Sequence, residues 1–258
     1  MTLNIHNVSF AYQAHQTILN NVSLTFHPGI FYVIIGKNGC GKSTLFNLIM
    51  RHLPLDSGEI TVNGKNLMQC SYQEQARTIS VLSQSMPLPE YMTVADMVMQ
   101  GRYCYQSFLS RYSKQDQVIT DRAMQQMEIT DLSNKRLSAL SGGQQQRARM
   151  AMLLAQQTEI VLLDEPTSHL DLKHQYLLLD MGRDLARQGK TVIAILHDMT
   201  QAALYADEVI VLSEQGVYAQ GDAQSVITDK MMEQVFEIST LRVGSKKVGV
   251  HVPTHLIT

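Results

Sequence analysis

The sequence predicts an α/β protein whose core holds buried parallel strands. Three short apolar runs carry this prediction, at residues 30–35, 160–163 and 191–196, and each ends at polar residues. Runs that are apolar on both faces belong in the middle of a parallel sheet rather than at a solvated edge. The chain has 258 residues, of which 45% are hydrophobic. It is therefore long enough for one large α/β domain or for a core with an inserted lobe.

Bulk composition excludes several classes of protein. The formal net charge is −2, which gives no support for a nucleic-acid partner held by bulk electrostatics. Cys40, Cys70 and Cys104 have neither a C-x-x-C pair nor metal-ligand spacing, so we expect reduced thiols in a cytosolic protein. The N-terminus lacks the pattern of a signal peptide, and no run reaches the roughly 18 apolar residues that span a bilayer. Any membrane role is therefore expected to depend on a partner.

The chain begins with two alternating segments, residues 3–12 and 18–26, which predict a hairpin or meander. A His-Pro-Gly turn at 27–29 then leads into the strand at 30–35. Tyr12 stands at the end of the first segment. By itself it indicates a half-buried strand aromatic, and the other interpretation is a stacking platform for an adenine ring.

A glycine-rich loop at 36–44 follows that strand and precedes an apolar helix at 45–50. A strand, a loop with Lys-Ser and a helix are together typical of a phosphate site, because loop N–H groups and the helix N-terminus point at an anion. Lys42 would supply positive charge for the β and γ phosphates, and Ser43 a hydroxyl for Mg²⁺. The alternative is an ordinary glycine-rich turn, which the flanking strand and helix argue against.

A connection between lobes is predicted after the strand at 79–82. Two prolines follow Gln84 closely and forbid simple continuation of the strand. Helices are expected next at 93–102, with Thr93 as N-cap, and at 114–128. The aromatic and basic loop between these helices is interpreted either as a packed lobe surface or as a contact patch for another protein.

Ser141 is predicted to cap a helix at 144–157. Gly142 and Gly143 leave N–H groups of this helix open to an anion, and the helix dipole favours negative charge there. The chain thus carries two helix N-termini shaped for phosphate, whereas one ATP has one triphosphate tail. We infer a symmetric head-to-tail pair, in which each subunit lends its second terminus to the nucleotide of its partner. The alternative is an ordinary capped helix.

Two carboxylates end the apolar strand at 160–163. Asp164 suits Mg²⁺, directly or through water, and Glu165 suits polarising an attacking water. His197 follows the strand at 191–196, and a C-terminal strand end favours a γ-phosphate contact over a satisfied core histidine. The remaining elements are expected as helices at 172–188, 199–206 and 223–236 and as strands at 208–213, 216–220 and within 241–252.

Taken together, these motifs resemble the ATP-binding cassette family over almost the whole chain. The family's alignment is also what favours the stacking interpretation of Tyr12. His169 stands where Ala or Gly is common in the family, and Cys40 suggests a thiol open to oxidation beside the phosphates. The matching motifs are the phosphate loop at 36–44, the Q-loop glutamine Gln84, the signature at 140–144, the Walker B strand at 160–165, the D-loop at 168–171, the switch histidine His197 and the A-loop aromatic Tyr12.

The resemblance implies one ABC ATPase domain over residues 1–258, a P-loop NTPase with a RecA-like core, an antiparallel β subdomain and an inserted helical subdomain. The helical lobe would take about 87–157, and the core with its β lobe and tail about 1–86 and 158–258. The implied cofactors are ATP and Mg²⁺. Implied ATP-binding residues are Tyr12, Gly36, Lys37, Asn38, Gly39, Cys40, Gly41, Lys42, Ser43, Thr44, Ser141, Gly142, Gly143, Gln144 and Asp171. Implied catalytic residues are Glu165, His197, Gln84 and Lys42, and implied metal ligands are Ser43, Gln84 and Asp164.

The resemblance also implies a mechanism in which two cassettes sandwich two Mg·ATP molecules, close on binding and open after hydrolysis. Gln84 and the helical lobe would sense this cycle and move integral membrane permease subunits. We therefore expect a homodimer, peripheral at the cytoplasmic face of the plasma membrane. A substrate-binding protein would be an indirect partner, and no nucleic acid is expected.

The subfamily is indicated by residues 97–102, by the aromatic-rich loop after them and by the helix near Lys114, which resemble importers of iron–siderophore, haem and cobalamin. The tail at 221–229 points the same way. We favour an iron–siderophore importer because that branch is the most populous, with haem, cobalamin or molybdate as alternatives. An exporter subunit is a further alternative. A soluble ATPase of translation or DNA repair fits badly, because this chain has one cassette and a short insert.

Overall fold

A computed structural model describes residues 1–13, 16–83, 89, 91–106, 111–168, 170–244 and 249–253, with side chains as far as residue 240. The chain divides into two compact units, one of residues 1–69 with 179–258 and one of residues 70–178. The division predicted above, with a helical lobe at about 87–157, stays a prediction.

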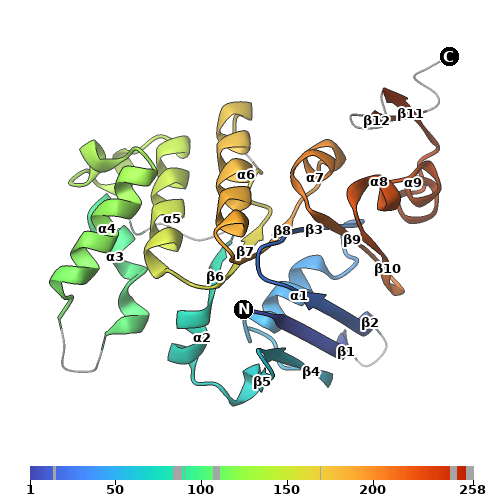
Figure 1. Cartoon of the computed structure of the whole chain (residues 1–258), viewed down its shortest axis with the longest axis horizontal. Coiled ribbons are helices and arrows are strands. Elements are labelled where there is room, and N and C mark those ends of the chain that lie inside the picture. Colours follow the sequence, from blue (N-terminus) through green and yellow to red (C-terminus); the bar gives the residue numbers. More distant parts are fainter. Residues whose placement is uncertain are drawn as a thin grey trace. The chain divides into compact units, whose positions relative to one another are not determined.

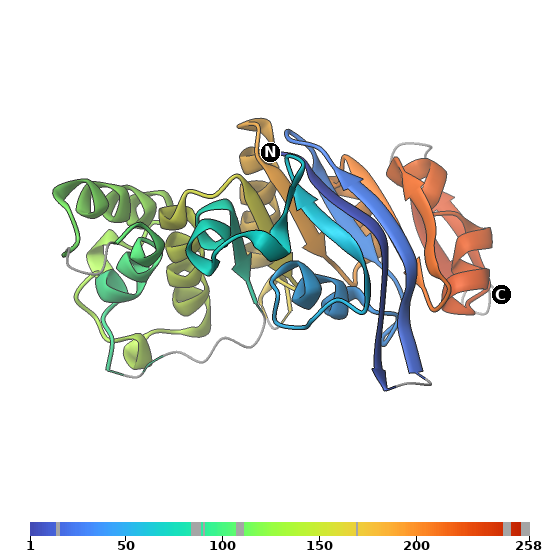
Figure 2. The same ribbon diagram turned by 90° about the horizontal axis from the view of Figure 1, so that it is seen from below.

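The first unit contains an antiparallel sheet in the order β2-β1-β4-β5. β1 pairs with β2 on one side and with β4 on the other, which confirms the predicted N-terminal hairpin, seen as the long blue strands of Figure 2. A register shift between Ile5 and Val8 keeps both side chains in the core although they are not an even number of residues apart. The bounds are β1 (Leu3–Gln13), β2 (Gln16–Phe26), β4 (Ser57–Val62) and β5 (Lys65–Asn66).

The same unit contains the strand that leads into the glycine-rich loop. β3 lies between β8 and β9 and is parallel to both, while β10 runs antiparallel to β9. Every residue of β3 and β8 is buried, which confirms the parallel placement predicted from their apolar composition. The bounds are β3 (Phe31–Ile35), α1 (Lys42–Ile49), η1 (Leu67–Gln69), β8 (Thr191–Ile195), α7 (Met199–Tyr205), β9 (Glu208–Ser213) and β10 (Gly216–Gly221).

The C-terminal tail corrects one prediction. The sequence predicts one helix over 223–236, whereas the structure has two, α8 (Ala223–Val226) and α9 (Asp229–Phe236). The break falls at Thr228, whose backbone is extended and whose hydroxyl accepts the Met231 N–H at 3.1 Å, so Thr228 starts a new helix instead of continuing the first. The predicted short strands are confirmed as the antiparallel pair β11 (Thr240–Gly244) and β12 (Gly249–Pro253).

The second unit is a group of helices with one parallel pair of strands, β6 and β7. Within it α5 packs against both α3 and α4, drawn in green in Figure 1. Thr93, Ser113 and Ser141 each close a capping box at the start of a helix, which confirms Thr93 and Ser141 as predicted caps. The bounds are α2 (Tyr72–Thr78), β6 (Ile79–Leu82), α3 (Val94–Gln100), η2 (Tyr103–Tyr105), α4 (Lys114–Gln126), η3 (Thr130–Leu132), η4 (Leu137–Ala139), α5 (Gly142–Gln156) and β7 (Ile160–Asp164), and α6 (Leu172–Arg187) runs across the division between the units.

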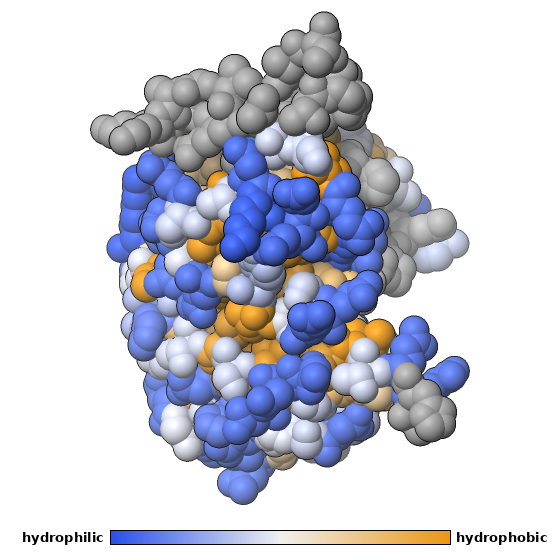
Figure 3. Space-filling model, turned by 90° about the vertical axis from the view of Figure 1, so that its right-hand side faces the viewer, coloured by the Kyte–Doolittle hydropathy of each residue, from blue (hydrophilic) through white to orange (hydrophobic). Residues whose placement is uncertain are grey.

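The surface of the first unit is mixed in character. On the face shown in Figure 3, apolar side chains form separate patches among hydrophilic ones. Tyr218 and Ile238 are among the large apolar residues that remain exposed. Within the described ranges, none of the helices combines the length and the apolar content that crossing a membrane requires.

Candidate nucleotide site

The glycine-rich loop is formed where β3 ends and α1 begins. An added Cβ at Gly36 would lie 2.3 Å from the carbonyl oxygen of Leu212, and at Gly41 it would lie 2.6 Å from the side chain of Leu19. Gly41 also has φ of 101°, which disfavours any residue with a side chain. These two positions therefore need glycine for space as well as for conformation, and the loop backbone stays uncovered.

Lys42 is buried at the start of α1, with only 5% of its surface exposed. Its ammonium donates to the carbonyls of Gly36 at 2.7 Å and of Lys37 at 2.8 Å, and within the described part of the chain it forms no ion pair. A buried cation whose partners are neutral carbonyls, at a helix N-terminus, retains attraction for an anion. The loop therefore fits the phosphates of a nucleotide.

Cys40 belongs to the same loop and is almost fully buried. Burial is the main cause that raises the pKa of the Cys40 thiol, and it outweighs the nearby charge of Lys42. Since the thiolate is the form that reacts with oxidants, this environment makes Cys40 less reactive than its place in the loop suggests.

Tyr12, near the end of β1, lies beside the first turn of α1. Its hydroxyl is 3.4 Å from the Thr44 hydroxyl, and its ring meets Phe10 edge-on with the ring centroids 5.0 Å apart. The Tyr12 side chain keeps 55% of its surface exposed. The structure thus places Tyr12 beside the phosphate loop with more than half of its surface exposed. Its stacking on adenine stays a prediction.

His197 follows β8, which is parallel to β3 with Ile34 opposite Ile195. Continuing that register by two residues sets His197 opposite Gly36, at the same edge of the sheet as the loop. The next residue, Asp198, caps α7 by accepting the Thr200 N–H at 2.7 Å. His197 is exposed between the strand end and this capped helix.

The signature residues form the N-terminus of α5 in the second unit. Ser141 accepts the Gln144 N–H at 3.4 Å, and the Gln144 side chain in turn accepts the Ser141 N–H at 3.0 Å. An added Cβ at Gly142 would meet open space, whereas one at Gly143 would lie 3.0 Å from the imidazole of His174. Gly142 therefore leaves this helix terminus accessible, and Gly143 allows His174 to pack against it.

β7 ends at Asp164, and Glu165 follows with φ of 47°, in the left-handed region that residues other than glycine seldom adopt. The carboxylate of Glu165 is 3.5 Å from the Ser168 hydroxyl. Both carboxylates and Gly142 border one pocket of about 190 Å³ within the second unit. The lining is completed by Leu82, Ser83, Gln145, Gln146, Arg149, Pro166, Ser168 and Leu170.

Asp171 makes a structural contact that is not among the predictions from the sequence. Its carboxylate accepts the His174 backbone N–H at 3.0 Å and lies 2.6 Å from the His174 imidazole, so it caps the start of α6. These hydrogen bonds from His174 lower the pKa of Asp171. An Asp three residues before a His at a helix start is the signal in the sequence. The role of Asp171 towards ATP stays a prediction, and Gln84 and His169 lie outside the described residues.

The described residues contain no cluster of three or more His, Cys, Asp or Glu side chains that would hold a metal by itself. Mg²⁺ that accompanies a nucleotide needs only one or two protein ligands, because phosphates and waters fill its other positions. Ser43 is exposed on the first turn of α1. Its hydroxyl and the carboxylate of Asp164 are oxygen donors of the kind Mg²⁺ prefers, so the donor chemistry fits.

Known proteins match this chain closely. A model of the ABC transporter family matches residues 19–168. The achromobactin transport ATP-binding protein CbrD of Dickeya dadantii is 41% identical over 226 residues, which cover 87% of this chain and 84% of that protein. The ferric enterobactin transport ATP-binding protein FepC of Escherichia coli K12 is 38% identical over 234 residues, 90% of this chain and 86% of that protein.

The fold is matched as well. A solved chain from a transporter assigned to the metal-chelate type of ABC transporter, in an inward-facing conformation, has a TM-score of 0.84 and 26% identity and covers 99% of both chains. This likeness confirms the predicted P-loop NTPase fold. The family model spans more than half of the chain and both relatives cover most of it, so this protein belongs to the ABC transporter family, as one of its ATP-hydrolysing subunits.

Proposed function

We propose that this chain powers the uptake of an iron–siderophore complex through a partner membrane permease. The observation that carries the proposal is the agreement of the two relatives, which are named for achromobactin and for ferric enterobactin transport and match over more than four fifths of each chain. The likeness to a metal-chelate type transporter over the full length supports the same class of cargo. The names of these relatives favour an importer over a soluble ATPase or an exporter.

The phosphate loop grips the triphosphate in this proposal. Lys42 offers its charge to the β and γ phosphates, because its hydrogen bonds to the carbonyls of Gly36 and Lys37 neutralise none of that charge. The rest of the loop and the first turn of α1 contribute further ATP-binding residues, namely Asn38, Gly39, Cys40 and Thr44. Tyr12 takes the adenine ring on its exposed face.

Mg²⁺, when bound with ATP, neutralises charge that develops on the phosphates. Ser43 and Asp164 would hold it, with Gln84 as a third ligand. A variant with Asp164→Asn should therefore bind ATP with little dependence on added Mg²⁺, while the parent binds more tightly when Mg²⁺ is present. Nucleotide affinity is the readout here, so the result does not depend on turnover.

Glu165 acts on the attacking water, and His197 acts on the γ-phosphate. Glu165 polarises the water, and the 3.5 Å contact with Ser168 limits where its carboxylate points. His197 contacts the γ-phosphate from the strand edge that also carries the loop. We expect Glu165→Gln to bind ATP, to hydrolyse it very slowly and to accumulate as a closed dimer; wild-type turnover in this variant would falsify the assignment.

The terminus of α5 acts on the nucleotide of a second copy. Ser141, Gly142, Gly143 and Gln144 present this terminus, and the open space at Gly142 leaves room for a phosphate. If two such copies share each ATP, mixing Lys42→Ala with Ser141→Arg subunits restores one intact site, because each variant supplies what the other lacks. Complete absence of rescue would count against the shared site.

The transport role itself is tested by reconstituting the chain with candidate permease and substrate-binding proteins. Iron–siderophore uptake into proteoliposomes is measured with wild type and with Glu165→Gln as the matched inactive control. ATP-dependent uptake of the chelate supports the proposal. If haem, cobalamin or molybdate is taken up in preference, that compound becomes the assigned cargo. If the chain binds to ribosomes instead of to the permease, both the transport role and its place at the cytoplasmic face of the membrane are refuted.

A further inference from the structure

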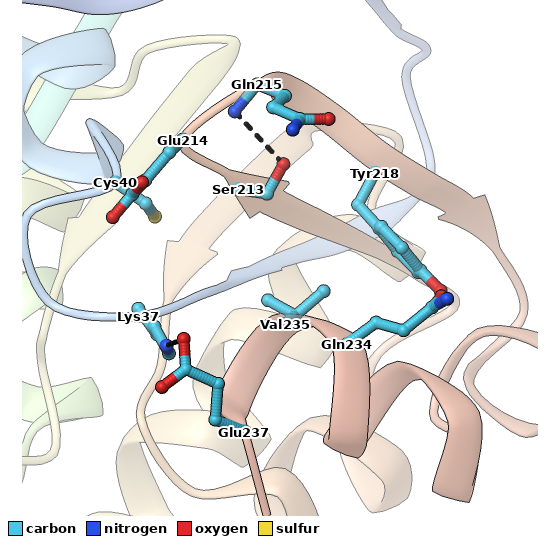
Figure 4. A pocket seen from close by; sticks show the side chains of 9 residues that line it. All are labelled: Lys37, Cys40, Ser213, Glu214, Gln215, Tyr218, Gln234, Val235 and Glu237. Atoms are coloured by element: carbon cyan, nitrogen blue, oxygen red, sulfur yellow. Dashed lines mark hydrogen bonds and ion pairs between the residues drawn. The ribbon is translucent and has the colours of Figure 1, made fainter.

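The phosphate loop has a contact with the C-terminal tail that no motif predicts. The ammonium of Lys37 lies 2.6 Å from a carboxylate oxygen of Glu237, and Figure 4 shows the two side chains facing each other. The backbone carbonyl of Lys37 also accepts the Lys42 ammonium at 2.8 Å and the Cys40 N–H at 3.4 Å. Lys37 therefore connects the tail to the buried Lys42: its side chain contacts Glu237, and its backbone carbonyl accepts from the Lys42 ammonium.

Glu237 is held in place by the end of α9. It is the C-cap residue, with φ of 59°, and its N–H donates to the Glu233 carbonyl at 3.1 Å. The helix before it is anchored by Met231 and Val235, which are buried. This support fixes the backbone of Glu237 beside the loop, while its side chain remains largely exposed.

A pocket of about 450 Å³ lies beside this pair, entirely within the first unit. Lys37 and Glu237 border it, and Cys40 and Val235 contribute apolar surface (Figure 4). Because the Lys37 side chain faces this open space, the contact with Glu237 is what limits its motion on that side. The hydrogen bond and the charge of Lys37 both lower the pKa of Glu237, which favours the ionised form of its carboxyl group. The lining is completed by Ser213, Glu214, Gln215, Tyr218 and Gln234.

We propose that Glu237 is a positioning residue for the phosphate loop, acting through Lys37 on the carbonyl that orients Lys42. This inference rests on the proposed role of the loop in binding ATP. A loop that is already ordered loses less freedom when the nucleotide binds, so the pair raises ATP affinity. The effect is the same for bound ATP and for the transition state, so it changes KM and leaves kcat unaltered.

The size of the effect follows from exposure. Side-chain exposure is 33% for Lys37 and 79% for Glu237, so solvent and salt weaken the pair strongly. We expect Glu237→Gln to weaken ATP binding by about two- to five-fold at low ionic strength, the range typical of an exposed ion pair. The difference in ATP affinity between wild type and Glu237→Gln should decrease as salt is added, because salt screens the same attraction that is absent from the variant.

The experiment measures the ATP dissociation constant and steady-state kinetics of the full chain. Glu233→Gln is the matched control, because Glu233 is an exposed carboxylate one turn earlier on α9 that takes part in none of the ion pairs of the described residues. We expect weaker binding in Glu237→Gln with kcat unchanged, wild-type behaviour in Glu233→Gln, and recovery in Glu237→Asp. In a Lys37→Met background, Glu237→Gln should have no further effect.

Two results overturn the inference. One is ATP binding in Glu237→Gln that equals or exceeds that of wild type, since release of Lys37 would then not disturb the loop. The other is an equal loss in the Lys37→Met background, which would mean that Glu237 acts through something other than Lys37. A wild-type chain that binds no ATP would instead remove the nucleotide site itself, and so separates the failure of the proposed function from the failure of this inference.

Discussion

The sharpest test of the packing in the second unit is the substitution Asp116→Asn. Asp116 and Arg102 are buried at 9% and 5% exposure, and Arg102 Nε donates to the Asp116 carboxylate at 2.9 Å. The other carboxylate oxygen accepts from the N–H of Ser113 at 2.9 Å and from its hydroxyl at 2.7 Å. Arg102 also donates to the Ala155 carbonyl at 2.8 Å and stacks on the ring of Tyr105 with its guanidinium carbon 3.8 Å from the centroid.

The expected loss of stability in Asp116→Asn follows from the replacement of a carboxylate oxygen, which accepts hydrogen bonds, by an NH₂ group, which donates them. Every polar contact of the Asp116 carboxylate is with a donor, so the new NH₂ group would face a donor whichever way it turned. Arg102 would keep a buried charge without its anion. Removing one partner of a buried pair costs about 3–5 kcal/mol, and we take about 3 kcal/mol because one oxygen remains. For a chain of this size that corresponds to a fall in Tm of roughly 6–12 °C.

The assay is thermal unfolding of wild type, Asp116→Asn and the control Asp121→Asn. Asp121 lies on the same helix, is exposed, and accepts from Gln117 at 2.9 Å, so its loss should move Tm by about 1–2 °C at most. Burial alone would raise the pKa of Asp116, but hydrogen bonds from Arg102 and Ser113 lower it overall. A lowered pKa gives stability that is present above the unfolded value of about 3.9 and is lost as pH falls through the folded value.

The difference between wild type and Asp116→Asn should therefore be constant near neutral pH and shrink below about pH 4. Equal melting temperatures for wild type and Asp116→Asn would refute the reasoning, because the buried guanidinium would then have tolerated the loss of its anion. A difference that persists unchanged in acid would show that packing, and not ionisation, is responsible.

Three further predictions concern single positions. Gly36→Ala should weaken ATP binding by more than ten-fold in nucleotide titrations, since its methyl group would lie 2.3 Å from the Leu212 carbonyl; unchanged affinity would mean that the loop can shift freely. Gly101→Ala should lower stability by about 1–3 kcal/mol in denaturant unfolding, because its methyl would lie 2.3 Å from the Met152 carbonyl, and wild-type stability would contradict this. Tyr12→Ala should cost about 1–3 kcal/mol of ATP affinity while Tyr12→Phe costs little; if both variants bind like wild type, the ring does not stack.

Local patterns predicted much of this fold. The caps at Thr93 and Ser141 were predictable because each depends on residues three positions apart. The same logic would have found α2, since Ser71 and Glu74 form a capping box at its start. Thr228 shows the limit, because an apolar helical period continues across it while its hydroxyl starts a second helix.

Contacts between distant residues could not be predicted in this way. The ion pair of Lys37 with Glu237 joins the phosphate loop to the end of the tail, and no spacing rule connects them. The packing of His174 against Gly143 likewise depends on how α6 begins relative to α5. Such contacts arise only when the elements are packed together. The sequence therefore indicates the candidate site residues, but it does not indicate which distant residues hold them in position.

The backbone conformation of Glu165 bears on the role proposed for its side chain. The sequence predicts different roles for the neighbouring carboxylates of Asp164 and Glu165. In the structure, Glu165 is a left-handed residue directly after β7, which turns the chain away from the strand. A left-handed conformation costs a residue with a Cβ about 1–2 kcal/mol. Glycine or asparagine would form this turn at lower cost. The backbone therefore does not explain why a glutamate stands here, and the role proposed for its carboxylate is a reason that is independent of the turn.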